Sequence, residues 1–132
     1  MRRAMLALLA LPAFAAACGN QAGPAQPSLS AFAEGTCRVA APDLLAIGRA
    51  GAQLGEDRTV DASVLQQLKD AQDGLRTVTD GAEPAYRTAF QDLVESTGFV
   101  RIRATGNGYE PALGRQLRAD YAAVLKLCTV SS

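Results

Sequence analysis

The residues of this sequence with the most distinctive chemistry are its three cysteines, Cys18, Cys37 and Cys128. No two of them form a C-x-x-C motif, so a thioredoxin-like redox site is not expected. An odd number of cysteines is unfavourable in an oxidising compartment, because the thiol left over stays reactive. If Cys18 is modified, Cys37 and Cys128 remain as one pair.

Carboxylates are the other side chains that could do chemistry. Three pairs lie close together in the sequence: Asp92 with Glu95, Asp70 with Asp73, and Glu56 with Asp57. A hydrolase that uses two carboxylates needs both of them in one cleft and with shifted pKa values. Solvated helix faces carry the same spacing far more often. We therefore expect no catalytic residues, and a protein that is not an enzyme.

Histidine does not occur in the sequence. Its absence excludes Ser-His-Asp and Cys-His catalysis and every metal site that uses histidine ligands. The sequence also has no P-loop and no glycine-rich dinucleotide fingerprint, because Gly106-Asn107-Gly108 is typical of a turn. The sequence therefore predicts no cofactor and no metal site.

The first seventeen residues have the three-part organisation of a secretory signal peptide. Arg2 and Arg3 supply positive charge, residues 4–14 form an apolar run, and residues 15–17 are alanines. The apolar run is too short to span a bilayer, which takes about 20 residues. We expect residues 1–17 to be removed as a signal peptide. An ordinary buried helix is the alternative.

Cys18 follows Ala15, Ala16 and Ala17, and this sequence resembles the lipobox of bacterial lipoprotein precursors. The resemblance implies transfer of a diacylglyceryl group to Cys18, cleavage before it, and a lipid-modified N-terminus. Many lipoboxes carry Leu where this chain has Ala15, and the alternative is cleavage after Ala17 that leaves a thiol. The cysteine count favours lipidation. The chain is similar to small helical lipoproteins of high-GC bacteria, which implies the extracytoplasmic face of the cell membrane.

Residues 19–35 are rich in Gly, Pro, Gln and Ser and contain little that could be buried. This composition is typical of a flexible linker. We expect residues 18–35 to form a lipid-anchored tether with a root-mean-square reach of roughly 20–25 Å, and residues 36–132 to form a helical domain. Leu29 and Phe32 are exceptions in the linker, and we expect them to touch the domain or the membrane.

Four stretches carry apolar residues at three- and four-residue spacing, which is typical of the buried face of a helix. The first two expected helices cover about residues 37–54 and 61–80. The third begins at Pro84 and precedes the turn signal at residues 105–108, and the fourth has Pro111 near its start and runs to about Cys128. Their apolar stripes are Leu44, Ile47, Gly51 and Leu54; Leu65, Leu68, Leu75 and Val78; Tyr86, Phe90, Leu93, Thr97 and Val100; and Leu113, Leu117, Tyr121, Val124 and Cys128.

Prolines indicate where three of these helices begin. Pro84 and Pro111 fit a first turn, and so does Pro42, which would leave Cys37 just before the regular helix or in a distorted opening turn. Residues 99–103 alternate like a short strand. A lone strand has nothing to pair with, so helix is favoured there.

Short connections between four helices predict antiparallel neighbours, and so an all-α, up-down-up-down four-helix bundle. In that topology the start of the first helix and the end of the last lie at the same end. Cys37 is at the first position and Cys128 at the second. We therefore predict that one disulfide closes the bundle. The alternative is two unrelated buried thiols.

The sequence carries 13 basic and 13 acidic residues, and the part after the leader has a net charge of −2. That balance gives no reason to expect a nucleic acid as partner. The region after Gly98 is nonetheless basic, mainly through Arg101, Arg103, Arg115 and Arg118. These residues could form one patch for anionic lipid or an acidic partner. Neutralisation between neighbouring helices is the alternative that we favour.

These observations predict a binding or structural module of the cell envelope, held at the membrane through the lipid on Cys18. An envelope protein is the expected partner, because a tether lets a small domain search the region near the membrane surface. A carrier or sensor domain, with an apolar small molecule between the helices, is the second hypothesis.

Overall fold

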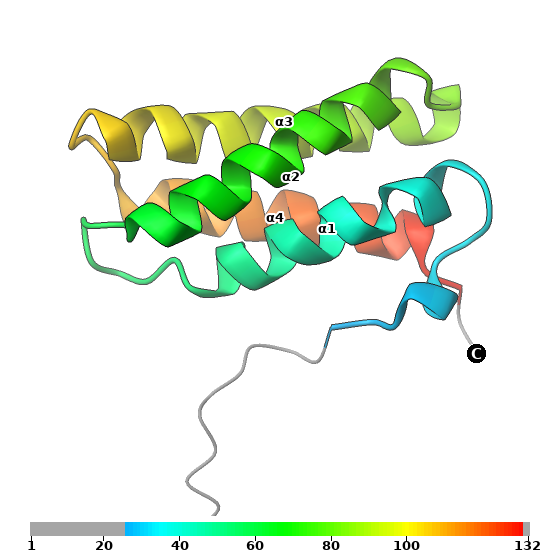
Figure 1. Cartoon of the computed structure of the whole chain (residues 1–132), viewed down its shortest axis with the longest axis horizontal. Helices are drawn as coiled ribbons and strands as arrows, with labels where there is room; N and C mark the ends of the chain where they lie inside the picture. Colours follow the sequence, from blue (N-terminus) through cyan, green and yellow to red (C-terminus); the bar gives the residue numbers. More distant parts are fainter. Residues whose placement is uncertain (1–25, 131–132) are drawn as a thin grey trace, which may run out of the picture.

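The computed structural model describes residues 26–130. Within that range a short 3-10 helix, η1 (Leu29–Ala31), precedes four α-helices: α1 (Thr36–Ala52), α2 (Ala62–Asp80), α3 (Pro84–Thr105) and α4 (Pro111–Cys128). Each helix packs against its neighbours in the chain, and α4 also contacts α1. In Figure 1 α1 and α4 form one layer, and α2 and α3 form the other. The predicted up-down-up-down bundle is confirmed.

Two of the predicted helix starts are confirmed. Pro84 and Pro111 are the first residues of α3 and α4, where a missing N–H costs no helical hydrogen bond. α3 continues through residues 99–103 to Thr105, so the strand alternative for this stretch is wrong. The following turn reverses the chain at Asn107, whose φ of 58° is one that asparagine tolerates.

The predicted position of Pro42 is wrong. α1 begins at Thr36, after Gly35 with a φ of 83°, and Pro42 lies inside the helix. An interior proline costs about 3 kcal/mol, because one backbone hydrogen bond is lost. The turn before it is held by burial, since Cys37, Ala40 and Ala41 are all completely inaccessible to solvent. Their burial fixes a helical turn that local preference alone does not favour.

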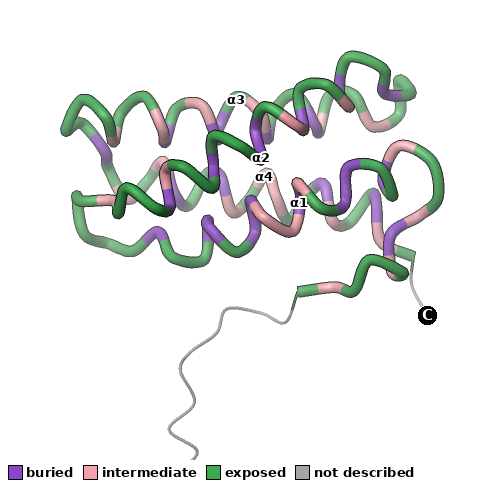
Figure 2. The backbone as a smooth tube through the Cα atoms, in the orientation of Figure 1, coloured by how far each residue is buried: buried purple, intermediate pink, exposed green. Residues whose placement is uncertain are grey.

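The core runs along the axis of the bundle, and every helix contributes to it, as the buried segments in Figure 2 show. The central residues of the predicted stripes are fully buried: Leu44, Ile47, Leu68, Leu75, Phe90, Leu93, Val100, Leu117 and Val124. On α2 the stripe is shifted by one position at its start, because Val64 is buried and Leu65 is half-buried. Gln72 is buried too, although no apolar pattern marks it.

The segment before α1 lies against the bundle. We call residues 26–35 the N-terminal strap. Its residue Phe32 is completely buried, and α1 contacts η1. In Figure 1 the strap runs beside α1 and α4, near the described end of α4. The sequence predicted a tether up to residue 35, but residues 26–35 already lie against the bundle. The predicted contact of Phe32 with the domain is present.

Candidate functional site

The disulfide joins Cys37, in the first turn of α1, to Cys128, the last residue of α4. Their Cα atoms are 5.3 Å apart, and both residues are completely buried. The prediction that one disulfide closes the bundle is confirmed. The closed loop spans 91 residues. In the chain-entropy model such a crosslink stabilises the folded state by about 4–5 kcal/mol.

The strap is paired with the chain on both sides of Thr129. The Ala33 N–H donates to the Cys128 carbonyl at 2.7 Å, and the Val130 N–H donates to the Ala31 carbonyl at 2.9 Å. These bonds form an isolated antiparallel bridge between Phe32 and Thr129. The strap is therefore attached to the disulfide end of the bundle through its backbone.

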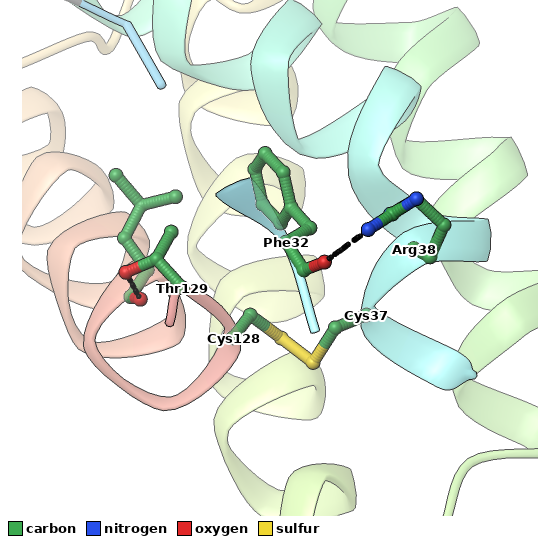
Figure 3. Close-up of a disulfide and its surroundings, with 6 residues drawn as sticks. Phe32, Cys37, Arg38, Cys128 and Thr129 are labelled. Atoms are coloured by element: carbon green, nitrogen blue, oxygen red, sulfur yellow. Dashed lines mark hydrogen bonds between the residues drawn. A yellow bond between two sulfur atoms is a disulfide. The ribbon is translucent and has the colours of Figure 1, made fainter. Parts of the chain in front are cut away.

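Side chains hold the strap at two further points. The Arg38 guanidinium donates to the Phe32 carbonyl, from Nη2 at 2.7 Å and from Nε at 3.2 Å. Figure 3 shows this contact beside the disulfide. At the other end of the strap, the Tyr121 hydroxyl donates to Gln26 Oε1 at 2.7 Å. Burial raises the pKa of the Tyr121 phenol. The strap therefore covers the seam between α1 and α4 from the disulfide to Gln26.

A glycine makes room for that second contact. A Cβ atom at Gly48 of α1 would lie 2.5 Å from the Tyr121 ring and hydroxyl and 2.7 Å from Gln26 Nε2. Real Cβ atoms do not approach other atoms so closely, so a larger residue here would displace the Tyr121 ring and the Gln26 side chain from their present positions. Gly51, one turn later, admits Leu117 of α4 in the same way.

Cys18 lies outside the described residues. Eight residue steps separate it from Gln26, the first described residue of the strap. A fully extended chain of that length spans about 28 Å. Cys18, the predicted lipidation site, is therefore separated from Gln26 by at most that distance.

A second feature is an open groove between α2 and α3, with a volume of about 350 Å³. Two apolar side chains of α3 at its edge face the solvent: Phe99 is 48% exposed and Ile102 is 72% exposed. Charged residues also line the groove, namely Arg76, Asp80 and Glu95. The groove thus combines an exposed apolar edge with both signs of charge.

The floor of the groove is a fixed polar group. Gln72 of α2 is 1% exposed, and its Nε2 donates to the Val94 carbonyl of α3 at 2.9 Å. Its other amide atom, Oε1, accepts a hydrogen bond from Arg101. Gly98 allows this approach, because a Cβ there would lie 2.9 Å from Gln72 Nε2. Sequence reasoning missed Gln72, since its partners are more than twenty residues away in the chain.

The candidate carboxylate pairs do not converge on one cleft. Asp73 binds Lys69 at 2.9 Å, and the hydrogen bond from that lysine lowers the pKa of Asp73. Glu56 is paired with Arg115 at 3.1 Å. Asp92 lies on an exposed helix face, and Glu95 alone of these residues lines the groove. Residues 26–130 hold no cluster of three His, Cys, Asp or Glu side chains able to bind a metal.

Three arginines of the basic C-terminal region bind different partners. Arg101 binds Gln72 on the side of α2, while Arg115 binds Glu56 in the loop after α1. Arg118 Nη1 donates to the Leu54 and Gly51 carbonyls, at 2.9 and 3.2 Å. It thus supplies a hydrogen-bond donor to carbonyl groups at the C-terminal end of α1. Only Arg115 is neutralised by an acidic side chain, and that side chain belongs to a loop; Arg101 and Arg118 bind uncharged groups, so the favoured interpretation of neutralisation between neighbouring helices holds for none of them as stated.

The fold and these contacts define a disulfide-closed four-helix bundle with a strap along one seam and a groove along the opposite one. No helix within the described range is long and apolar enough to cross a bilayer. No protein-family model, characterised protein or solved structure matches the chain.

Proposed function

We propose that the mature chain is a lipid-anchored binding module of the bacterial cell envelope, attached to the membrane through Cys18. The disulfide carries this proposal. It uses two of the three cysteines, and a stable bridge is typical of proteins outside the cytoplasm. Cys18 is left without a bridging partner directly after the predicted signal peptide, and lipidation would consume that thiol.

The anchor is tested by expressing the precursor with Cys18→Ser in a bacterium and separating membrane from soluble fractions. We expect the unchanged chain to fractionate with membranes and to carry a diacylglyceryl mass increment on its N-terminal peptide. The variant should lose both. The matched control is the double variant Cys37→Ala/Cys128→Ala, which keeps Cys18 and should stay in the membrane fraction. Unchanged fractionation of Cys18→Ser would refute the anchor.

The groove between α2 and α3 supports a binding role. Phe99 and Ile102 are large apolar side chains that stay exposed beside a hollow of about 350 Å³, enough to receive a protruding side chain of another protein. Arg76, Asp80 and Glu95 at the rim could orient that partner through charge. We propose an envelope protein as the partner and a non-enzymatic role for the module.

Site-specific photocrosslinking in intact cells tests the binding role. A photoreactive residue at Ile102, at the edge of the groove, should give one discrete adduct. The same residue at Ala123, an exposed position of α4, is the matched control and should give none. Absence of an adduct at Ile102, or the same adduct at both positions, would contradict the groove as the partner site.

The hypothesis of an apolar small-molecule carrier is less well supported. The groove is open to solvent, and charged side chains line it. An apolar ligand would gain little from such a lining, because sites for these ligands are mostly enclosed and apolar. Co-purification of a lipid with the mature protein would reverse this preference.

A further inference from the structure

We propose that the module lies on the membrane with its α1/α4 face turned toward anionic lipid headgroups, so that the α2/α3 groove faces away from the bilayer. This inference rests on the proposed lipid anchor at Cys18. Three independent features of the described residues support it: the place where the strap begins, the distribution of charge between the two layers, and the exposed apolar side chains of the strap.

The strap restricts how far the anchor can be from this face. Gln26 is fixed on the seam, because it accepts a hydrogen bond from Tyr121 of α4 and lies against Gly48 of α1. Cys18 is eight residue steps away, which is at most about 28 Å. The 22 residues of α3 alone extend over about 33 Å. The reach is shorter than the bundle but exceeds the roughly 20 Å thickness of two helix layers, so the chain length favours, and does not by itself fix, the α1/α4 side, the lower side in Figure 1.

Charge differs between the two layers of the bundle. α1 and α4 together carry five basic and two acidic residues, whereas α2 and α3 together carry five of each. One of the two acids, Asp43, is turned away from this face, since its carboxylate lies against Gly74 of α2. Arg115 is paired with Glu56, and Arg118 is bonded to carbonyls of α1. Arg38, Arg49 and Lys126 remain, against Asp120 and the exposed Glu34 of the strap, so the layer keeps a small net positive charge.

The basic residues form two parallel rows. Arg38 and Arg49 are eleven residues apart on α1, and Arg115 and Lys126 are eleven apart on α4. Eleven residues make three helical turns, so each pair shares one face of its helix. Arg38 binds the strap at Phe32, which places the α1 row beside the strap.

The other members of the rows lie on the same side of the bundle. The charge of Arg49 acts on the Tyr121 hydroxyl, which holds the strap. Arg115 reaches Glu56 just after α1, which places the α4 row on the α1 side of its helix. Arg49 and Lys126 are exposed, and their charged side-chain groups make no hydrogen bond or salt bridge within residues 26–130. Arg38 and Arg49 thus lie beside the strap, and Lys126 lies two residues before Cys128, whose carbonyl the strap binds.

Exposed apolar side chains of the strap and of the chain end bonded to it lie on the same side of the bundle. Leu29 of η1 is 51% exposed and Val130 is 59% exposed, and the Val130 N–H bonds to Ala31 of the strap. Basic side chains beside exposed apolar ones are the combination that binds the interface of an anionic bilayer. This surface therefore fits a membrane that contains acidic phospholipid.

Tryptophan fluorescence can test the orientation, because the chain contains no tryptophan. Two single-tryptophan variants, Leu29→Trp and Ile102→Trp, place the probe on the α1/α4 face or beside the opposite groove. Each precursor is expressed in a bacterium, and its processed product is purified and mixed with vesicles of phosphatidylethanolamine and phosphatidylglycerol, part of whose acyl chains are brominated. We expect several-fold stronger quenching and a blue shift for the Leu29→Trp variant only.

The contribution of the basic rows to membrane binding is tested with variants that also carry Leu29→Trp. Arg49→Gln with Lys126→Gln removes two cations from the rows, while Lys69→Gln with Arg103→Gln, on α2 and α3, is the matched control. About fivefold weaker headgroup binding is expected for each cation removed near the surface. Quenching should therefore fall in the first double variant alone, and only when phosphatidylglycerol is present.

The outcomes separate the anchor from the orientation. Protein that fails to float with vesicles refutes the lipid anchor and this inference together. Protein that floats but shows equal quenching at the two probe positions, or stronger quenching at Ile102→Trp, refutes the orientation and leaves the anchor intact. Quenching that does not depend on phosphatidylglycerol refutes the role of the basic rows.

Discussion

Replacing Phe32 by alanine should lower the free energy of unfolding by about 3–5 kcal/mol. Phe32 is completely buried between the strap and the bundle, although the sequence around it looks like a linker. A buried phenylalanine removes about 150–250 Å² from water. At about 25 cal/mol per Å² that area corresponds to roughly 4–6 kcal/mol, of which alanine retains a small part. The loss is large beside the 5–15 kcal/mol typical of a whole domain.

The assay is urea unfolding of the mature domain with its disulfide intact, followed by far-UV circular dichroism. Leu29→Ala is the matched control, because Leu29 is in the same strap but 51% exposed, and its cost should stay below about 0.5 kcal/mol. Removal of residues up to 35 should cost at least as much as Phe32→Ala. A cost below about 1 kcal/mol for Phe32→Ala would refute the view that the strap belongs to the folded domain.

Three further changes have defined outcomes. The double variant Cys37→Ala/Cys128→Ala should lower unfolding stability by about 4 kcal/mol while leaving the helical circular dichroism, because it removes the 91-residue crosslink; an unchanged urea midpoint would contradict this. Tyr109→Phe should leave stability unchanged or raise it by up to about 1 kcal/mol, since its buried hydroxyl has no hydrogen-bond partner within residues 26–130; a clear loss would reveal a missed partner. Burial raises the pKa of Asp43 above 3.8, so the folded state holds this proton more tightly than the unfolded chain, and the charged carboxylate costs stability above that pH. Asp43→Asn should therefore raise the melting temperature at pH 7 but not at pH 3, whereas an equal shift at both pH values would point to packing instead of charge.

The helices and the disulfide were predictable because their signals are local or topological. Phe90, Leu93 and Val100 repeat with the helical period, so the face of α3 that is buried follows from spacing alone. The pairing of Cys37 with Cys128 followed from counting helices, since an even number of antiparallel helices brings both ends of the chain together. Neither inference needed knowledge of a specific contact between side chains.

The strap and the groove depend on specific contacts between distant residues. The strap could not be predicted, because its composition is that of a linker. It is stabilised by the buried ring of Phe32 and by backbone hydrogen bonds to residues about a hundred positions later. Gln72 is buried because Val94 and Arg101 satisfy its amide, and no periodic pattern records such partners. Pro42 was misplaced for a related reason: a local preference for the first turn is overridden by the burial of Cys37 and Ala40.

The strap also changes what the proposed anchor can do. A tether that reached residue 35 would let the domain tumble freely, so that every face met possible partners equally. With Gln26 fixed on the α1/α4 seam, the chain between Cys18 and the domain spans at most about 28 Å, and its root-mean-square reach under random-coil statistics is roughly 15 Å. Shorter linkage raises the effective concentration of the domain close to the bilayer and biases which face is presented. In the proposed orientation, a partner that uses the Phe99 groove approaches from the side away from the lipid. This favours an envelope protein that projects from the same membrane or lies above it over one that is embedded in the bilayer.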